Sequence, residues 1–272
     1  MHIGRLQSEC ERMSTREKAG GRSQRKQEGI SLSIFLCEVN DCHDAMESNL
    51  VEVTQVYVEK DSPAYNHNNV KKLCEKMPQD RVNILEGNRF RDKIDTNRSQ
   101  GILIKAQAST FSALPKTKKI NSCYVILDQV QDPHNLGQIL RICAGASIDG
   151  VIITERNSVS MTSAVAQVSQ GGFAKIPLYS VTNINQAITH FKKDDFWITS
   201  FENNIDAKDW YKIDLKGRSI LIFGGEGNGV SKQVLKNSDF TATIPMSNQM
   251  NSLNVSSAVS AIVFERLRQV ST

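Results

Sequence analysis

Hydrophobic and polar positions divide this chain of 272 residues into a polar start and two regions of alternating strands and helices. Residues 1–29 show almost no apolar periodicity, and this pattern predicts a disordered basic tail. Between residues 30 and 108, short apolar runs typical of strands alternate with amphipathic runs. The expected strands cover residues 30–39, 53–60, 82–87 and 100–107, and the expected helices cover 41–50 and 66–77. This part is therefore predicted to be a small α/β domain.

Residues 109–120, which contain Pro115 and a cluster of lysines, are predicted to be a linker. A second alternation follows in residues 121–272, and strands that alternate with helices predict a parallel sheet covered on both faces. The expected strands are 123–128, 149–154, 175–181, 196–201, 219–224 and 241–246, and the expected helices are 136–146, 161–170, 184–193, 230–236 and 254–270.

Charge and composition narrow the class of protein only slightly. The net charge is +4, and residues 1–29 contribute +3 of it, because seven Lys or Arg face four Glu there. Such a tail could contact phosphates, but a solvated extension explains it equally well. No apolar run reaches the roughly 18–20 residues of a membrane span, and the start lacks the apolar middle of a secretory signal. We therefore expect a cytoplasmic protein without a membrane segment.

The six cysteines form no CxxC pair. Cys37, Cys42 and His43 lie close together, but a zinc site would need a fourth ligand that the sequence does not offer. We expect reduced, partly buried thiols and no metal site.

The first loop with chemistry of its own follows the strand at 123–128. Asp132-Pro133 predicts a turn, and Asn135 suits the N-cap of the next helix. Gly137 permits a close backbone approach, and Arg141 lies further along the same helix. A cap and a surface cation would explain both polar residues without any function.

The second loop breaks a very apolar strand into four glycines around Glu226 and Asn228. Val230 stands where a dinucleotide-binding fingerprint would have its third glycine, and no GK[ST] of a phosphate-binding loop is present. Glycines at a strand end let the backbone approach a ligand, and an acid there suits a cationic or amino-bearing ligand better than a phosphate.

The third loop, residues 251–256, places small polar residues directly before the last predicted helix, where free N–H groups are available. Helix capping explains either Ser252 or Asn254, but it does not easily explain the whole polar cluster.

Together, N-x-G-x-x-x-R at 135–141, the strand into GGEGNG at 224–229, and IPM with NSLNVSSA at 244–258 resemble the three motifs of the SpoU family of RNA 2′-O-ribose methyltransferases, of the SPOUT superfamily. The resemblance covers residues 120–270 and is strongest to bacterial enzymes that methylate guanosine in 23S ribosomal RNA. Those enzymes carry an N-terminal domain similar to a large-subunit ribosomal protein. Residues 30–108 look like that domain, and 99–102 match the usual sequence at its C-terminal end. Residues 36–46, however, depart from its usual glycine-containing start.

This resemblance implies a trefoil knot in the second domain, a rare exception to the rule against knots. It implies that S-adenosyl-L-methionine is the methyl donor, held by backbone groups of Gly224, Ile244 and Leu253, and that RNA is the substrate. It also implies a homodimer with the site at the subunit interface and the helix at 255–268 as part of that interface.

By the same resemblance, Arg141 is the central catalytic residue, and Asn135, Glu226, Ser252 and Asn254 position the ribose, the donor and Arg141. An arginine is a poor base, so it would orient the 2′-hydroxyl and stabilise the developing alkoxide. Alternatives are a transfer-RNA target, methylation of an adenosine, and an RNA-binding or ribosome-assembly protein without activity.

Overall fold

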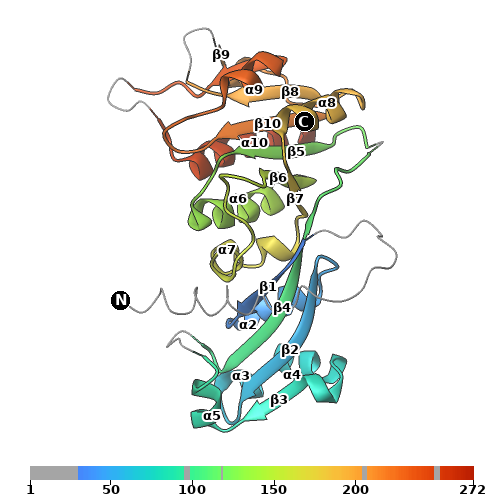
Figure 1. Ribbon diagram of the computed structural model, residues 1–272, viewed down its shortest axis with the longest axis vertical. Coiled ribbons are helices and arrows are strands. Elements are labelled where there is room, and N and C mark those ends of the chain that lie inside the picture. Colours follow the sequence, from blue (N-terminus) through green and yellow to red (C-terminus); the bar gives the residue numbers. More distant parts are fainter. Residues whose placement is uncertain (1–29, 95–98, 118, 204–206, 248–251) are drawn as a thin grey trace.

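The computed structural model describes residues 30–94, 99–117, 119–203, 207–247 and 252–272, and the predicted tail at 1–29 lies outside them. Within these residues the strands form one 11-stranded sheet in the order β3-β2-β4-β7-β6-β5-β10-β8-β11-β9, with β1 paired to β4. Figure 1 shows the two halves of the chain stacked along the long axis of the molecule.

The N-terminal half contains a mixed sheet. Strands β1 and β2 pair antiparallel with β4, and β3 pairs parallel with β2. The elements are β1 Ile30–Leu36, α2 Val39–Met46, β2 Val51–Glu59, α3 Pro63–Asn66, α4 Asn68–Lys76, η1 Gln79–Arg81, β3 Val82–Leu85, α5 Gly87–Arg91 and β4 Ile102–Phe111.

The C-terminal half contains the strands that lie in parallel order. Its elements are β5 Cys123–Asp128, α6 Pro133–Gly145, β6 Gly150–Thr154, α7 Ser163–Ser169, η2 Gly172–Ala174, β7 Leu178–Val181, α8 Ile184–Lys192, β8 Trp197–Phe201, β9 Lys208–Asp209, η3 Trp210–Lys212, β10 Ser219–Gly224, α9 Lys232–Asn237, β11 Phe240–Thr243 and α10 Val255–Ser271. The sequence pattern predicted these strands and helices except for the two-residue strand β9 and the short η turns.

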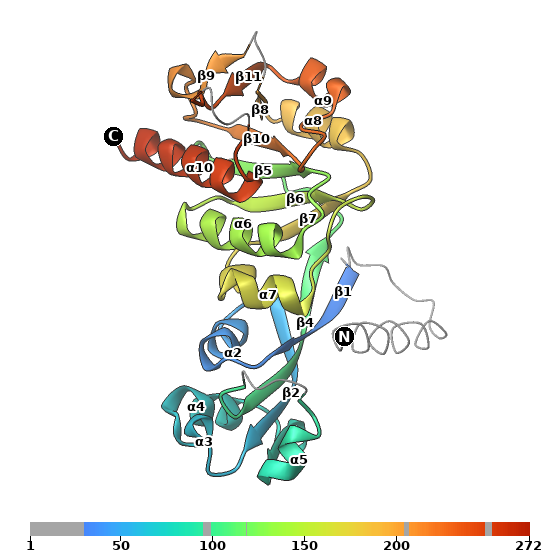
Figure 2. The ribbon, with the colours of Figure 1, turned by 90° about the vertical axis from the view of Figure 1, so that its left-hand side faces the viewer.

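Helices cover both faces of the parallel strands, as predicted. Helices α6, α7 and α10 lie on one face, and α8 and α9 lie on the other (Figure 2). The central strands β5 and β10 are buried along almost their whole length, which explains why they read as continuous apolar runs.

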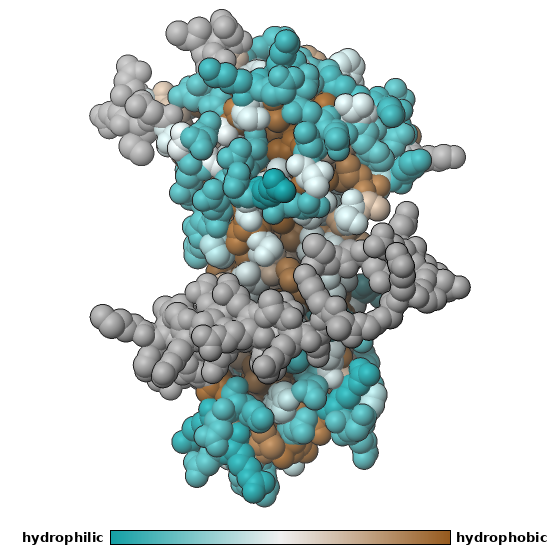
Figure 3. All heavy atoms as spheres, viewed as in Figure 1, coloured by the Kyte–Doolittle hydropathy of each residue, from teal (hydrophilic) through white to brown (hydrophobic). Residues whose placement is uncertain are grey.

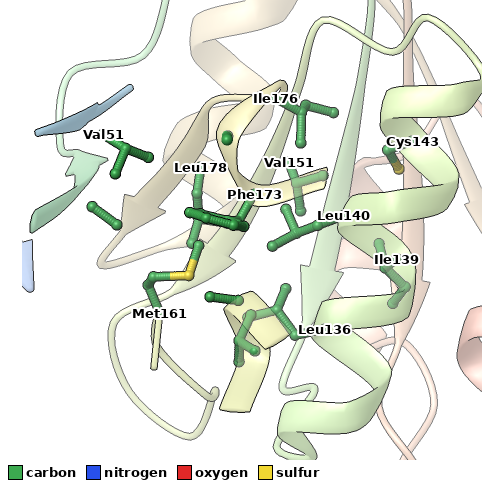
Figure 4. Close-up of a cluster of buried hydrophobic side chains, with 14 of the residues drawn as sticks. Val51, Leu136, Ile139, Leu140, Cys143, Val151, Met161, Phe173, Ile176 and Leu178 are labelled. Atoms are coloured by element: carbon green, nitrogen blue, oxygen red, sulfur yellow. The ribbon is translucent and has the colours of Figure 1, made fainter. Parts of the chain in front are cut away.

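Helix α6 packs through a stripe of apolar side chains, whose i, i+3, i+4, i+7 spacing places them on one helix face. Figure 4 shows these side chains meeting residues from β6, β7 and the η2 segment. The stripe consists of Leu136, Ile139, Leu140 and Cys143.

The two halves share a sheet and a core. Strand β4 runs to Phe111 because Thr110 and Phe111 pair with Leu178 and Tyr179 of β7. The predicted linker at 109–120 therefore begins inside a strand. Val51 of β2 belongs to the same buried cluster as the α6 stripe (Figure 4).

Helix α10 is fastened to the sheet by a buried arginine. Arg266 is 3% exposed, and its guanidinium donates to Ser219 Oγ (3.1 Å), Asn121 O (3.0 Å) and Gly217 O (3.2 Å). Gln269 adds a bond from Leu215 N to its own Oε1 (2.8 Å). These contacts fix the helix whose first residues carry the third motif.

We expect Arg266→Ala to lower the free energy of unfolding by about 2–4 kcal/mol, because two backbone carbonyls and a hydroxyl would lose a charged donor inside the protein. Urea denaturation measures this change. Arg268→Ala is the matched control, since Arg268 is an exposed partner of Glu265 on the same helix, and its loss should cost no more than about 0.5 kcal/mol. Equal losses of stability in the two variants would contradict the conclusion that buried Arg266 fastens α10 to the sheet.

Candidate functional site

The carboxyl ends of β5 and β10 lie side by side, because these strands pair in parallel with Gly224 opposite Asp128. The loop before the first motif begins after Asp128, and the second motif begins at Gly224 itself. Parallel pairing therefore brings the two loops to one edge of the sheet, where ligands bind in open α/β folds.

The first motif differs from its prediction in one respect. The N-cap of α6 is Asp132, whose Oδ1 accepts from His134 N (2.9 Å), and Asn135 lies inside the first helical turn. Pro133 explains the difference, since proline suits the first helical position and starts the helix earlier than the apolar pattern does. The interpretation of Asn135 as the cap was wrong, and its side chain is free for another role.

Asn135 joins all three motifs. Its side chain is buried, donates from Nδ2 to Glu226 Oε1 (2.7 Å), and accepts from Asn254 Nδ2 at Oδ1 (2.9 Å). Asn254 also caps α10, because its Oδ1 accepts from Ser256 N (2.8 Å). The side chain of Asn254 therefore caps α10 and bonds to Asn135 at the same time.

The glycine-rich loop is closely packed at Gly224, Gly225 and Gly229 and open at Gly227. A Cβ on Gly224 would lie 2.0 Å from the carbonyl carbon of Gly229, so the close approach requires glycine. Gly225 N donates to Asp128 O (2.7 Å), and Gly229 N donates to Gly225 O (3.2 Å). The loop is thus folded back on itself beside the end of β5, with Glu226 exposed.

Two carboxylates that the sequence analysis did not select hold this loop. Asp128 Oδ2 accepts from Ser231 N (3.0 Å), and Glu202 Oε2 accepts from Val230 N (2.6 Å). Each acid stands at the end of a strand or directly after it, which is the pattern that would have identified both.

A hollow of about 460 Å³ opens where the first two loops meet. Its walls are the segment 129–132, Asn135, Val255 of α10, and Gly225, Glu226 and Asn228 of the glycine-rich loop. Among these lining residues, Asp132 and Glu226 are acidic and none is lysine or arginine. The hollow therefore favours a cationic ligand over a phosphate.

Arg141 does not join this cluster within one chain. It lies six residues after Asn135 on α6, which places it about 120° around the helix and about 9 Å along it. Its side chain is exposed and donates from Nη1 to Oε1 of Gln170, the residue that follows α7.

The other predicted residues do not line the hollow. Ser252 and Leu253 are exposed directly before α10, and Gly224 and Ile244 lie at the ends of β10 and β11. The structure therefore connects Asn135, Glu226 and Asn254 with one another, and leaves Arg141 and Ser252 apart from them.

A second hollow, of about 410 Å³, lies between the first helix of the N-terminal half and the end of α7. It is acidic as well, since Glu38, Asp41 and Asp44 of the α2 region line it together with Gln170. Burial, with the charges of Glu38 and Asp44, raises the pKa of Asp41 to about 7.

The described part of the chain includes several buried cysteines. Cys42, Cys74, Cys123 and Cys143 are free thiols, and burial raises the pKa of Cys42 and Cys143. No group of three or more His, Cys, Asp or Glu side chains in these residues is arranged to hold a metal ion. None of the described helices is long and apolar enough to cross a bilayer.

Comparison with known proteins identifies the family. The SpoU rRNA Methylase family matches residues 122–264, which is more than half of the chain, and the protein belongs to this family. The matched region includes the loops that meet at the hollow.

Two relatives and one solved structure extend the match. A Staphylococcus aureus protein assigned to the TrmH family of tRNA/rRNA methyltransferases is 38% identical over 164 residues, which span 60% of this chain and 66% of that protein. An uncharacterized tRNA/rRNA methyltransferase of Borreliella burgdorferi is 38% identical over 181 residues, 65% of this chain and 77% of the relative. The SpoU methyltransferase AviRb of Streptomyces viridochromogenes, crystallised with AdoMet, has a TM-score of 0.74 at 17% identity, covering 87% of this chain and 90% of its own, and so shares the fold.

Asp41 should make stability depend on pH. Its folded-state pKa of about 7 exceeds the ordinary 3.8, so the folded protein binds the extra proton, and wild-type stability should fall as pH rises from about 4 to about 7. Asp41→Asn removes this titration. The free energy of unfolding of the variant should exceed that of wild type by about 1–3 kcal/mol at pH 8, with a smaller difference below pH 5. Urea denaturation at both pH values tests this expectation. Glu52→Gln, which alters an exposed carboxylate of β2, is the control. An effect of Asp41→Asn that does not change with pH would refute Asp41 as the source of the pH dependence.

Proposed function

We propose that this protein transfers a methyl group from S-adenosylmethionine to a ribose 2′-hydroxyl of RNA, with a guanosine of 23S ribosomal RNA as the target. The observation that carries the proposal is the hydrogen-bonded chain Glu226–Asn135–Asn254, which joins three separate motifs at one sheet edge of a SpoU-family domain. Folding alone requires neither this connection nor the acid in the glycine-rich loop.

The residues at this edge suit a methyl donor with a sulfonium and an amino group. Two carboxylates and several amide groups line the hollow. Beside it, the absence of a Cβ at Gly224 allows the backbone of the loop to pack closely. Backbone groups of Gly224, Ile244 and Leu253 would hold the adenosyl part, within a C-terminal segment knotted as a trefoil. The donor supplies an already activated methyl group, so the protein has to align the acceptor hydroxyl and assist the loss of its proton.

We assign to Arg141 the contact with the reacting 2′-oxygen. A guanidinium keeps its positive charge and offers several N–H donors, so it would orient the 2′-hydroxyl and stabilise the developing alkoxide. Asn135, Glu226, Ser252 and Asn254 would position the ribose and the donor around it.

The separation of Arg141 from the other residues supports a homodimer. Arg141 faces away from Asn135 on α6, so the arginine of one copy would complete the cluster of the other. Phe264 of α10 is 46% exposed and Leu253 is 43% exposed, which suits a contact between copies. Figure 3, seen from the same side as Figure 1, shows hydrophobic residues among hydrophilic ones along the middle of the molecule.

The N-terminal half, residues 30–108, would bind the RNA and deliver it to the second domain at 121–272. Its first helix departs from the ribosomal-protein pattern, and the acids Glu38, Asp41 and Asp44 there would repel phosphate. We therefore expect the RNA backbone to approach this half away from the α2 hollow.

A transfer-RNA target is the second candidate, because the two relatives carry names that include both tRNA and rRNA. Mapping 2′-O-methyl positions in ribosomal and transfer RNA from cells with and without the protein would distinguish the two. Methylation confined to transfer RNA would overturn the ribosomal assignment.

Arg141→Ala should lose methyl transfer by at least about a hundredfold while donor binding stays within about twofold. Tritium transfer to total RNA measures the first quantity, and calorimetry measures the second. Lys193→Ala, an exposed cation next to α8 on the opposite face, is the control. Near-normal turnover of Arg141→Ala would exclude the assignment, and donor binding by a wild-type protein that methylates no RNA would indicate an inactive RNA-binding protein.

Asn254→Ser tests whether the polar chain does more than cap a helix. Serine keeps an oxygen for Ser256 N but lacks the amide that donates to Asn135. We expect the unfolding free energy to fall by about 1–3 kcal/mol, because the buried Oδ1 of Asn135 loses its donor, and methyl transfer by the folded protein to fall about tenfold or more.

The matched control for this variant is Asn183→Ser, because Asn183 caps α8 through the same kind of bond, from its Oδ1 to the backbone N two residues later. It should change neither stability nor activity appreciably. If Asn254→Ser kept full activity, capping alone would explain Asn254.

A further inference from the structure

Arg141 is held by a residue in an unusual backbone conformation. Its partner Gln170 has φ 44° and ψ 60°, in the left-handed region that residues with a side chain rarely adopt. Such conformations persist where surrounding structure requires them, and they cluster at functional sites.

The glycines after Gln170 explain why the chain turns there. Gly171 has φ 83°, and a Cβ on it would lie 2.0 Å from Oδ2 of Asp44 in α2. A Cβ on Gly172 would lie 2.7 Å from the Cα of Arg141. The backbone beside Gln170 is therefore in contact with the N-terminal half on one side and with Arg141 itself on the other.

Further contacts fix this turn against the N-terminal half. Lys175 Nζ pairs with Asp44 (3.1 Å), and Ser48 Oγ donates to Ala174 O (2.5 Å). Phe173, directly before Ala174 in the chain, is buried in the core that α6 and β7 share (Figure 4). Gln170 thus projects from a segment whose place is set by both halves.

We propose that Gln170 is a positioning residue for Arg141, with its side-chain oxygen fixing the direction of the guanidinium. This inference rests on the proposed function, in which Arg141 acts on the 2′-hydroxyl. One N–H of the guanidinium is committed to Gln170, and the remaining donors stay available for the substrate. An arginine side chain without such a contact samples many rotamers, so a fixed direction reduces the ordering that the reaction requires.

Gln170→Gly tests the proposal, because glycine accepts the left-handed conformation and only the side chain is lost. We expect kcat to fall about tenfold or more, while the melting temperature and the dissociation constants for donor and RNA stay unchanged. Gln170→Glu keeps an oxygen that accepts from Arg141 and should retain most of the activity.

Ser147→Gly is the matched control, since Ser147 is exposed and also has a positive φ, of 56°, after α6. Its kcat should equal that of wild type. A second readout, independent of turnover, is the ¹⁵N spectrum of the arginine Nε–H groups: the Arg141 signal should be ordered in wild type and Gln170→Glu, and mobile in Gln170→Gly.

An unchanged kcat and an ordered Arg141 signal in Gln170→Gly would overturn the proposal. A lower melting temperature together with weaker donor binding would assign Gln170 a structural role and would also overturn it. Failure of wild type to methylate RNA would refute the proposed function instead, so the two failures are distinguishable.

Discussion

The parallel pairing of β5 with β10 is the constraint on which the site depends. It sets Asp128 opposite Gly224, so the loops that follow both strands begin at the same edge and within hydrogen-bonding reach. The third motif reaches them from α10, which Arg266 and Gln269 fasten to the segments before β5 and β10. A one-residue change in register would turn the side chains of a strand to the other face and separate these groups.

Most of the fold could be predicted because strands and helices bury their residues with different periods. The apolar run of β5 is too short for a typical helix, so it predicted a buried strand. The four-residue stripe of α6 has the spacing of one helix face. The end of β4 could not be predicted, because Thr110 and Phe111 pair with β7, about 70 residues later in the chain, and Thr110 also pairs with Ile30 of β1. The start of α6 was missed for a local reason, since Asp132-Pro133 was interpreted as a turn only, although it also begins the helix.

The candidate site was predictable as a set of loops and less so as a set of contacts. Strand ends directed attention to Asn135, Glu226 and Asn254, and the fold brings these three side chains into hydrogen-bond contact. The partner of Arg141 had no signature in the sequence, because Gln170 acquires its position from an uncommon backbone conformation and from the packing of α2 against two glycines. Asp128 and Glu202 were overlooked because an acid after a buried strand has many possible roles.

Burial divides the polar residues into two groups with different physical requirements. Asn135 is enclosed and satisfied on both sides of its amide, so its geometry is fixed before any ligand arrives, as electrostatic preorganisation requires. Arg141, Ser252 and Glu226 are exposed, and each is held by few contacts within the described part of the chain. In the proposed dimer, substrate or a second copy would cover these exposed groups, while Gln170 already directs the guanidinium of Arg141. Under the proposed function, the enclosed Asn135 would define where donor and ribose meet, and the exposed groups would adapt to an RNA whose shape the protein alone does not determine.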